Sequence, residues 1–240
     1  MDKNRFMKNK FNLKTMSGDI WIVVPAYEEE MMIGSVIDGL RSEGYDRIIV
    51  VDDGSTDDTA DIAESKGVEV IRHVENCGLG ASLRTGLKAA LDRDADVAVT
   101  FDADGQHDSK EIDKMVSLIE DGVDFVVGAR NRYQMPLNKK LGNSVLNVFT
   151  RFFGGILTDS QSGLRAFSRD ALEKIEIWSD GYSVSSEIVM QAGWHDLYSR
   201  EVEIEGIFTD YSKSGGTNIA DGVRIIFNLF CVIVLHSLHG

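Results

Sequence analysis

The chain has 240 residues, of which 43% are hydrophobic and 27% are charged, so a disordered or collagen-like protein is excluded. It carries 25 basic against 39 acidic residues, a net charge of −14, which disfavours nucleic acid as a partner because neutralising phosphates requires a basic face. The two cysteines, Cys77 and Cys231, form neither a disulfide framework nor a zinc-ligand spacing, which is typical of a reducing cytoplasmic setting.

The first predicted segment in chain order is a basic extension over residues 1–18, which is either a solvated tail or a weak lipid-surface contact. Short apolar runs of strand length then alternate with stretches of helical periodicity. The predicted strands are Ile20–Val24, Ile48–Val51, Val68–Ile71, Val97–Phe101 and Phe125–Val127. This alternation predicts an α/β fold with a Rossmann-like, mostly parallel sheet flanked by helices, which binds ligands at the carboxyl ends of its strands.

Polar motifs follow the first two strands. Pro25-Ala26-Tyr27 supplies a rigid turn and an aromatic ring that would shape a base or ribose pocket, and Glu28–Glu30 also suit the start of a helix. The second strand ends in Asp52 and Asp53, directly before a Gly-Ser-Thr-Asp turn that caps a helix. Helix capping does not account for the two aspartates, so we predict that a carboxylate here accepts hydrogen bonds from a ligand.

The glycine-rich stretch Asn76–Ala81, with Gly86 beyond it, has two interpretations. It resembles a phosphate-binding loop, but it lacks the complete G-x-G-x-x-G spacing and the Walker lysine. Glycines that allow a helix to pack closely on a sheet explain the stretch equally well, and both interpretations stay open.

The fourth strand ends in Asp102-Ala103-Asp104-Gly105-Gln106-His107, which is the most informative segment. Two carboxylates one residue apart leave an extended chain on the same side, and such hard oxygen ligands suit Mg²⁺ or Mn²⁺. We predict a metal site here, with His107 orienting the loop. Arg130, at the end of the fifth strand, is predicted to clamp a phosphate in the same cleft.

Two later segments are candidates for lipid contact. Lys140 and Ser144 are one helical turn apart at the head of an amphipathic stretch, so both would reach one acceptor phosphate from an interface helix; a core helix is the alternative. Residues 216–240 are predicted to form an apolar C-terminal helix, because Gly222–Leu238 is strongly apolar but shorter than the ~20 residues of a spanning helix. That helix either packs on the protein or lies at a membrane interface.

Taken in order, these motifs resemble family 2 glycosyltransferases of the GT-A fold, of the dolichyl- or polyprenyl-phosphate sugar synthase type. The resemblance covers residues 19–215 as one catalytic domain, and it includes a D-x-x-S-G-x-R segment at Asp159–Arg165 and a late S-K pair, Ser212-Lys213. The implied nucleotide-sugar-binding residues are Pro25, Tyr27, Glu29, Val51, Asp53, Asp102, Ala103 and Gln106. The implied metal ligands are Asp102, Asp104 and Gln106, and the implied catalytic residues are Asp104, Arg130 and Lys213. One departure is Glu28, where the family has asparagine.

The resemblance implies an inverting, metal-dependent transfer of a hexose from GDP-mannose or a UDP-hexose to dolichyl or polyprenyl phosphate. An anionic lipid phosphate needs positioning and no general base. We therefore expect a peripheral enzyme at the cytoplasmic face of the membrane, or a cytoplasmic one, with the membrane surface as a partner. Two alternatives remain: transfer to a sugar or protein hydroxyl, with Glu187 as the candidate base, and a non-catalytic module that binds nucleotide-sugars.

Overall fold

The structure is a computed structural model that describes residues 18–130, 162–204, 229 and 231–233. Seven strands form one sheet in the order β3-β2-β1-β4-β6-β5-β7. The strands are β1 (Ile20–Ala26), β2 (Ile48–Asp52), β3 (Glu69–Arg72), β4 (Val97–Thr100), β5 (Phe125–Arg130), β6 (Arg165–Ser168) and β7 (Ser199–Ile204). The helices are α1 (Ile33–Ser42), α2 (Thr59–Ser65), α3 (Leu79–Leu91), the 3₁₀ turn η2 (Ser109–Glu111), α4 (Ile112–Glu120), α6 (Arg169–Lys174) and α7 (Val184–Trp194). All five strands predicted from the sequence form.

The sheet is mostly parallel, as predicted. β3, β2, β1 and β4 are parallel neighbours, and β7 is parallel to β5. β6 is antiparallel to both β4 and β5, and it separates these two strands. The sequence analysis missed β6 and β7, because Arg-Ala-Phe-Ser and Ser-Arg-Glu-Val-Glu-Ile lack the apolar runs of the other strands.

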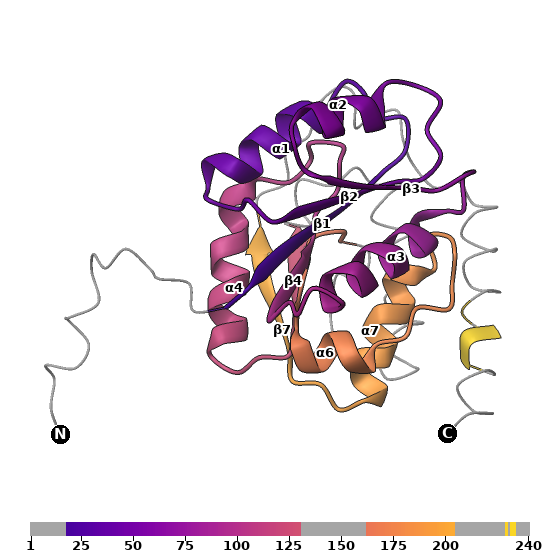
Figure 1. Cartoon of the computed structure of the whole chain (residues 1–240). Helices are drawn as coiled ribbons and strands as arrows, with labels where there is room; N and C mark the ends of the chain where they lie inside the picture. The colour runs from indigo at the N-terminus through magenta and orange to yellow at the C-terminus, as the bar shows by residue number, and fades with distance from the viewer. Residues whose placement is uncertain (1–17, 131–161, 205–228, 230, 234–240) are drawn as a thin grey trace, which may run out of the picture.

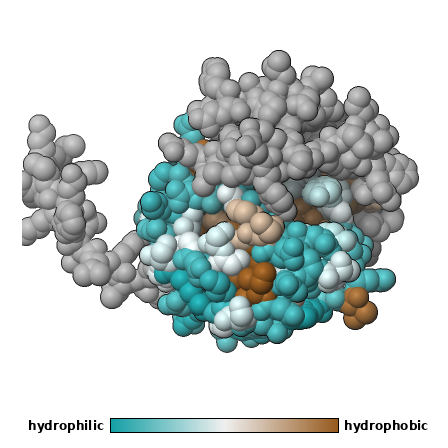
Figure 2. Space-filling model, turned by 90° about the horizontal axis from the view of Figure 1, so that it is seen from above, coloured by the Kyte–Doolittle hydropathy of each residue, from teal (hydrophilic) through white to brown (hydrophobic). Residues whose placement is uncertain are grey.

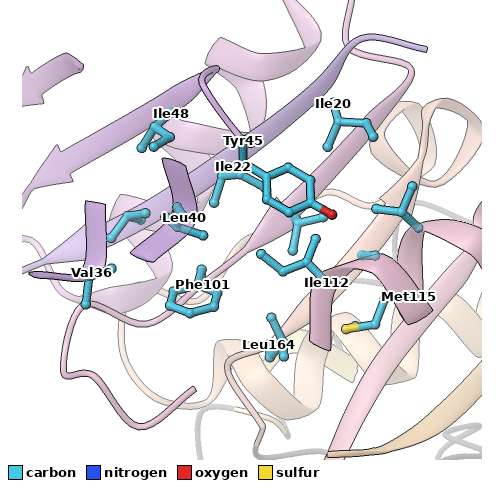
Figure 3. Close-up of a cluster of buried hydrophobic side chains, with 14 of the residues drawn as sticks. Ile20, Ile22, Val36, Leu40, Tyr45, Ile48, Phe101, Ile112, Met115 and Leu164 are labelled. Carbon is cyan, nitrogen blue, oxygen red and sulfur yellow. The ribbon is translucent and has the colours of Figure 1, made fainter. Parts of the chain in front are cut away.

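Helices cover both faces of the sheet, with α1, α2 and α4 on one side and α3, α6 and α7 on the other (Figure 1). Side chains of β1 alternate between the two layers: Ile22 and Val24 belong to one buried cluster and Val23 to the other. Figure 3 shows the first cluster, in which Ile22 lies among side chains such as Tyr45 and Ile112. Burial on both faces holds the sheet in place and leaves the strand ends to carry polar loops.

Several predicted segments lie outside the described residues. They are residues 1–17 of the basic extension, Lys140 and Ser144 with their amphipathic stretch, Lys213, and most of the apolar C-terminal segment. Among the described residues, no helix has the length and hydrophobicity needed to cross a membrane. The described part of the face in Figure 2 is mainly hydrophilic, with a small hydrophobic group near its centre.

Candidate active site

A pocket of about 400 Å³ opens at the carboxyl ends of β1, β2 and β4. Many of its lining residues were predicted from the sequence: Pro25, Tyr27, Glu29, Asp53, Asp102, Ala103 and Asp104. The other lining residues are Ala26, Asn76, Gly78, Leu79, Ser82, Gly163, Gly181, Tyr182 and Ser185. The strand-end motifs therefore converge on one site, as a mostly parallel sheet requires.

Asp53 is 4% exposed and holds the loop that follows β3. Its Oδ1 accepts hydrogen bonds from His73 Nδ1 at 2.7 Å and from the Cys77 N–H at 3.0 Å, and its Oδ2 accepts one from the Gly78 N–H at 2.7 Å. Burial acts to raise the pKa of Asp53, but these hydrogen bonds outweigh it and hold the pKa below its ordinary value. His73 is fixed in turn, since its Nε2 lies 2.9 Å from Thr85 Oγ1.

The loops after β1 and β2 are tied together by side chains that bond backbone groups. The Glu29 N–H donates to Thr59 Oγ1 at 2.7 Å, and the Glu28 N–H donates to Ser55 Oγ at 3.0 Å. In return, Glu28 Oε1 accepts from the Thr56 N–H and from Thr56 Oγ1, both at 2.9 Å. Glu28 is thus directed at the neighbouring loop and is not among the pocket-lining residues, although it stands where the family has asparagine.

The loop after β4 holds the two carboxylates of the predicted metal site. Asp102 is oriented by His107, whose Nε2 lies 3.1 Å from Asp102 Oδ2, as expected for a loop-orienting histidine. The Gln106 backbone N–H donates to Asp104 Oδ1 at 2.9 Å, and the Gln106 side chain contacts the other oxygen. Burial and the nearby charge of Asp102 raise the pKa of Asp104. Two close carboxylates of this kind fit a divalent cation. Gln106, implied by the resemblance as a third ligand and a nucleotide-sugar contact, binds Asp104 and is not among the pocket-lining residues, so its position suits orienting Asp104.

Gly163, from the D-x-x-S-G-x-R segment, lies directly against Asp102. A Cβ built on Gly163 would fall 1.9 Å and 2.2 Å from the two Asp102 carboxylate oxygens. The Gly163 carbonyl also accepts a hydrogen bond from Thr100 Oγ1 at 2.7 Å. A glycine is therefore needed here so that the backbone before β6 can pass beside the carboxylate.

Glycines of the Asn76–Ala81 stretch serve close packing. Gly78 has φ +93°, and a Cβ there would fall 2.4 Å from the Asp180 carbonyl oxygen. A Cβ on Gly80 would fall 1.8 Å from the Ser179 carbonyl oxygen, and the Gly80 N–H donates to the Asp180 carbonyl at 2.7 Å. Gly78 and Gly80 therefore pack on the segment before α7, and Gly86 is the glycine that packs a helix on the sheet, since its Cβ would fall 2.2 Å from Val23; Gly78 also lines the pocket.

The sequence analysis missed one side of the pocket, formed by Gly181, Tyr182 and Ser185. These residues belong to the segment before α7 and to its first turn. Tyr182 is 64% exposed, so it is one of the few large apolar side chains at the described surface. The signal in the sequence was a Gly-Tyr-Ser triplet before a helix, which is too common to mark a site.

For three other predicted residues, the structure shows no contact with the pocket among the described side chains. Val51 is fully buried in the core on the α3 side and is not among the lining residues, so its predicted nucleotide contact is not supported by its side chain. Arg130 is the last residue of β5, and its side chain lies outside the described part of the structure. Glu187, the candidate base, is fully buried in α7 and does not line the pocket.

Glu187 instead binds backbone groups. Its Oε1 accepts from the Trp178 N–H at 2.7 Å and its Oε2 from the Ser179 N–H at 2.9 Å. Burial raises the pKa of Glu187, although these hydrogen bonds and one from Gln191 act in the opposite direction. Both carboxylate oxygens of Glu187 therefore accept backbone N–H groups, and Glu187 is not among the residues that line the pocket.

Comparison with known proteins supplies relatives over almost the whole chain. An uncharacterized protein of Methanocaldococcus jannaschii is 46% identical over 238 residues, which cover 95% of this chain and 96% of the relative. A UDP-N-acetylglucosamine–dolichyl-phosphate N-acetylglucosaminyltransferase of Methanococcus voltae is 42% identical, covering 88% of this chain and 94% of the relative. A polyprenol monophosphomannose synthase of Mycolicibacterium smegmatis is 28% identical, covering 84% and 83%.

Among solved structures, glucosyl-3-phosphoglycerate synthase of Mycobacterium tuberculosis, in complex with Mn²⁺, UDP and glucosyl-3-phosphoglycerate, has a TM-score of 0.71. It is 23% identical and covers 92% of this chain and 85% of its own, a likeness that concerns the fold alone. The family described as glycosyl transferase family 2 matches residues 21–176, which include the motifs after β1, β2 and β4. The chain therefore belongs to glycosyl transferase family 2, and it is a glycosyltransferase with a GT-A-like fold.

Proposed function

We propose that this glycosyltransferase transfers a sugar, with inversion, from a nucleotide-sugar to a dolichyl or polyprenyl phosphate. The observation that carries the proposal is the 42% identity, over nearly the full length of both chains, to a transferase named for UDP-N-acetylglucosamine and dolichyl phosphate. UDP-N-acetylglucosamine is therefore the donor that we propose first, ahead of GDP-mannose. The pocket supports this proposal, because it places an aromatic ring and three aspartates at one edge of the sheet.

We assign the pocket-lining residues to parts of the donor by their position in the pocket. Tyr27 and Asp53, which directly follow β1 and β2, are proposed to contact the nucleoside. Asp102 and Asp104 are proposed to hold Mg²⁺ or Mn²⁺, with Gln106 orienting Asp104. When bound, such an ion neutralises charge on the donor diphosphate and on the departing nucleotide. The roles of Arg130 and Lys213 on the donor phosphates, and of Lys140 and Ser144 on the acceptor phosphate, remain predictions.

A phosphate acceptor suits the groups that the pocket offers. A lipid phosphate is already anionic at neutral pH, so its oxygen can attack the anomeric carbon without losing a proton to the protein. Glu187 was the candidate base for a hydroxyl acceptor, and it is fully engaged with backbone N–H groups behind the pocket. Among the described lining residues, Asp53 is held by three hydrogen bonds and is equally unsuited to accept a proton.

We propose that the enzyme works at the cytoplasmic face of the membrane as a peripheral protein. Its acceptor is anchored in the bilayer, so the pocket has to approach the lipid surface. Large apolar side chains support this orientation: Tyr27 is 47% exposed, Met31 75%, Val74 fully exposed and Tyr182 64%. Tyr27 and Tyr182 line the pocket, and Met31 and Val74 lie on loops at the same edge of the sheet.

The test is a transfer assay with polyprenyl phosphate vesicles, Mg²⁺ or Mn²⁺, and a panel of UDP- and GDP-sugars. We expect a lipid-linked product from UDP-N-acetylglucosamine and none when free polyprenol replaces the phosphate. Asp104→Asn should abolish transfer, whereas Asp46→Asn, at an exposed site away from the pocket, should not change it. Transfer to a sugar or protein hydroxyl, or undiminished activity of Asp104→Asn in a chelator, would contradict the proposal.

A further inference from the structure

The segment Glu176–Tyr182, which we call the pocket wall, leads into the side of the pocket that the sequence analysis missed. Its last residues, Gly181 and Tyr182, line the pocket beside Asp53 and Asp102. Its first residues, Glu176–Trp178, line a second cavity of about 320 Å³ between α3 and α6. The wall therefore has open space on two sides, and its position depends on bonds to the helices that flank it.

Two side chains of α7, one helical turn apart, form hydrogen bonds with the backbone of the wall. Glu187 is fully buried and accepts the backbone N–H groups of Trp178 at 2.7 Å and Ser179 at 2.9 Å. Gln191 is 1% exposed, and its Oε1 accepts the Glu176 N–H at 2.7 Å. Gln191 Nε2 also contacts the Glu176 carbonyl and lies 3.2 Å from Glu187 Oε1. These bonds hold the wall much as a neighbouring strand would.

α3 holds the wall from the other side. The Gly80 N–H donates to the Asp180 carbonyl at 2.7 Å, and Gly78 and Gly80 lie too close to the wall for any side chain. The Gly78 N–H is also one of the three donors that fix Asp53. A continuous set of contacts therefore runs from Glu187, through the wall backbone and Gly78, to a carboxylate of the pocket.

We propose that Glu187 is a positioning residue of the transfer reaction, because it sets the place of the wall and so of Tyr182 beside the donor. The inference rests on the proposed function. It differs from the base role, in which Glu187 would exchange a proton with the acceptor, and from a purely structural role, in which its loss would lower stability alone. Tyr182 is the side chain through which the positioning reaches the pocket.

A double-mutant cycle tests the inference. In Glu187→Gln the new amide nitrogen cannot accept a hydrogen bond, so either the Trp178 or the Ser179 N–H loses its acceptor and the wall shifts. Misplacement of about 1 Å costs on the order of 100-fold in rate, and we expect a loss of this order in kcat/KM for the donor, assayed well below the variant's Tm. Tyr182→Ala removes an exposed side chain, so it should leave Tm unchanged and lower kcat/KM similarly.

The decisive measurement is the double variant. If Glu187 acts through Tyr182, the Glu187→Gln, Tyr182→Ala protein should lose little more than either single variant, whereas independent effects multiply. Glu69→Gln is the matched control: Glu69 is a half-buried carboxylate bonded to Arg93 at the opposite edge of the sheet, and its loss should leave donor kinetics unchanged. Hydrogen exchange should be faster at the Trp178 or the Ser179 amide in the variants that carry Glu187→Gln, and unchanged at both amides in Tyr182→Ala.

The outcomes separate the inference from the function on which it rests. A wild-type protein that is inactive with every donor contradicts the proposed function, and the inference with it. An active wild type whose Glu187→Gln variant has normal kinetics, or whose losses multiply, contradicts the inference alone. A fall in kcat with an unchanged donor KM and a missing ionisation in the pH–rate profile would assign Glu187 as a base instead.

Discussion

The two sides of the pocket are held by hydrogen bonds from different kinds of side chain, exposed on one side and buried on the other. On the strand-end side, the exposed side chains of Glu28 and Thr56 tie the loop after β1 to the loop after β2, and the proposed metal-binding carboxylates lie on the loop after β4. On the wall side, the bonds come from Glu187 and Gln191, which are almost completely buried. The strand-end side carries the groups proposed to bind the donor and the metal, and the wall side is fixed by buried side chains. Substitutions of similar size should therefore differ in their effects on activity and stability between the two sides.

The largest effect on activity is expected where the backbone before β6 passes the loop that carries the proposed metal ligands. In Gly163→Ala the new Cβ would fall about 2 Å from the Asp102 carboxylate, which has to move. We expect transfer to fall by on the order of 100-fold or more. Steady-state kinetics over a range of Mn²⁺ concentrations measures this loss.

Gly34→Ala is the control for Gly163→Ala, because Gly34 lies within α1 and its Cβ would make only ordinary contact, at 3.4 Å from Ile62. It should keep full activity. Equal activity of the two variants would mean that the position of Asp102 does not limit the reaction.

A second pair of variants separates positioning from stability within α3. In Gly80→Ala the Cβ would meet the Ser179 carbonyl oxygen of the wall, and in Gly86→Ala it would meet Val23 and Val51 in the core. Overpacking costs about 1–3 kcal/mol, so both should unfold at lower denaturant concentration. Only Gly80→Ala should also raise the donor KM. A normal KM in Gly80→Ala would show that the pocket tolerates movement of the wall.

The hydrogen bonds of Asp53 predict an acid-sensitive contribution to stability. Because its pKa is lower in the folded than in the unfolded chain, this contribution is present above the unfolded pKa of ~3.9 and is lost as the pH falls through the folded value. Denaturant unfolding at a series of pH values should show a shallower acid decline in Asp53→Asn than in the wild type. Parallel curves would indicate that Asp53 is not the group responsible.

The smallest effect is expected for Glu28→Ala on the strand-end side. The variant loses hydrogen bonds to Thr56 at an exposed site, which should cost about 1 kcal/mol in the free energy of unfolding. Kinetic constants should stay near wild type, since Glu28 does not line the pocket. Glu28→Asn should cost less than Glu28→Ala, because asparagine tolerates the left-handed φ of 55° found here. A large rise in donor KM would contradict this placement.

The sequence predicts the half of the site that follows from local pattern. Apolar runs locate β1, β2 and β4, and because the carboxyl ends of parallel strands lie at the same edge of the sheet, the polar motifs after them had to converge. The wall was not predictable in this way. Nothing in the sequence indicates that Glu187 accepts the amides of Trp178 and Ser179, because the bond joins a helix to an irregular segment. β6 could not be predicted for a related reason. It is short, and its first residue, Arg165, is a charged residue that is only 1% exposed, so the strand has no apolar run to identify it.

The insertion of β6 between β4 and β5 has a consequence for the order in which the protein is completed during synthesis. β5 follows β4 along the chain but does not pair with it, so it has no neighbour in the sheet until β6 has been made, and it gains its second neighbour with β7. The first four strands can associate earlier, since each of them pairs with another of the four, and only β4 gains a further neighbour, β6, later. Gly163 arrives with β6 and takes its place beside Asp102, so closure of the sheet and completion of the catalytic edge are one late, non-local event.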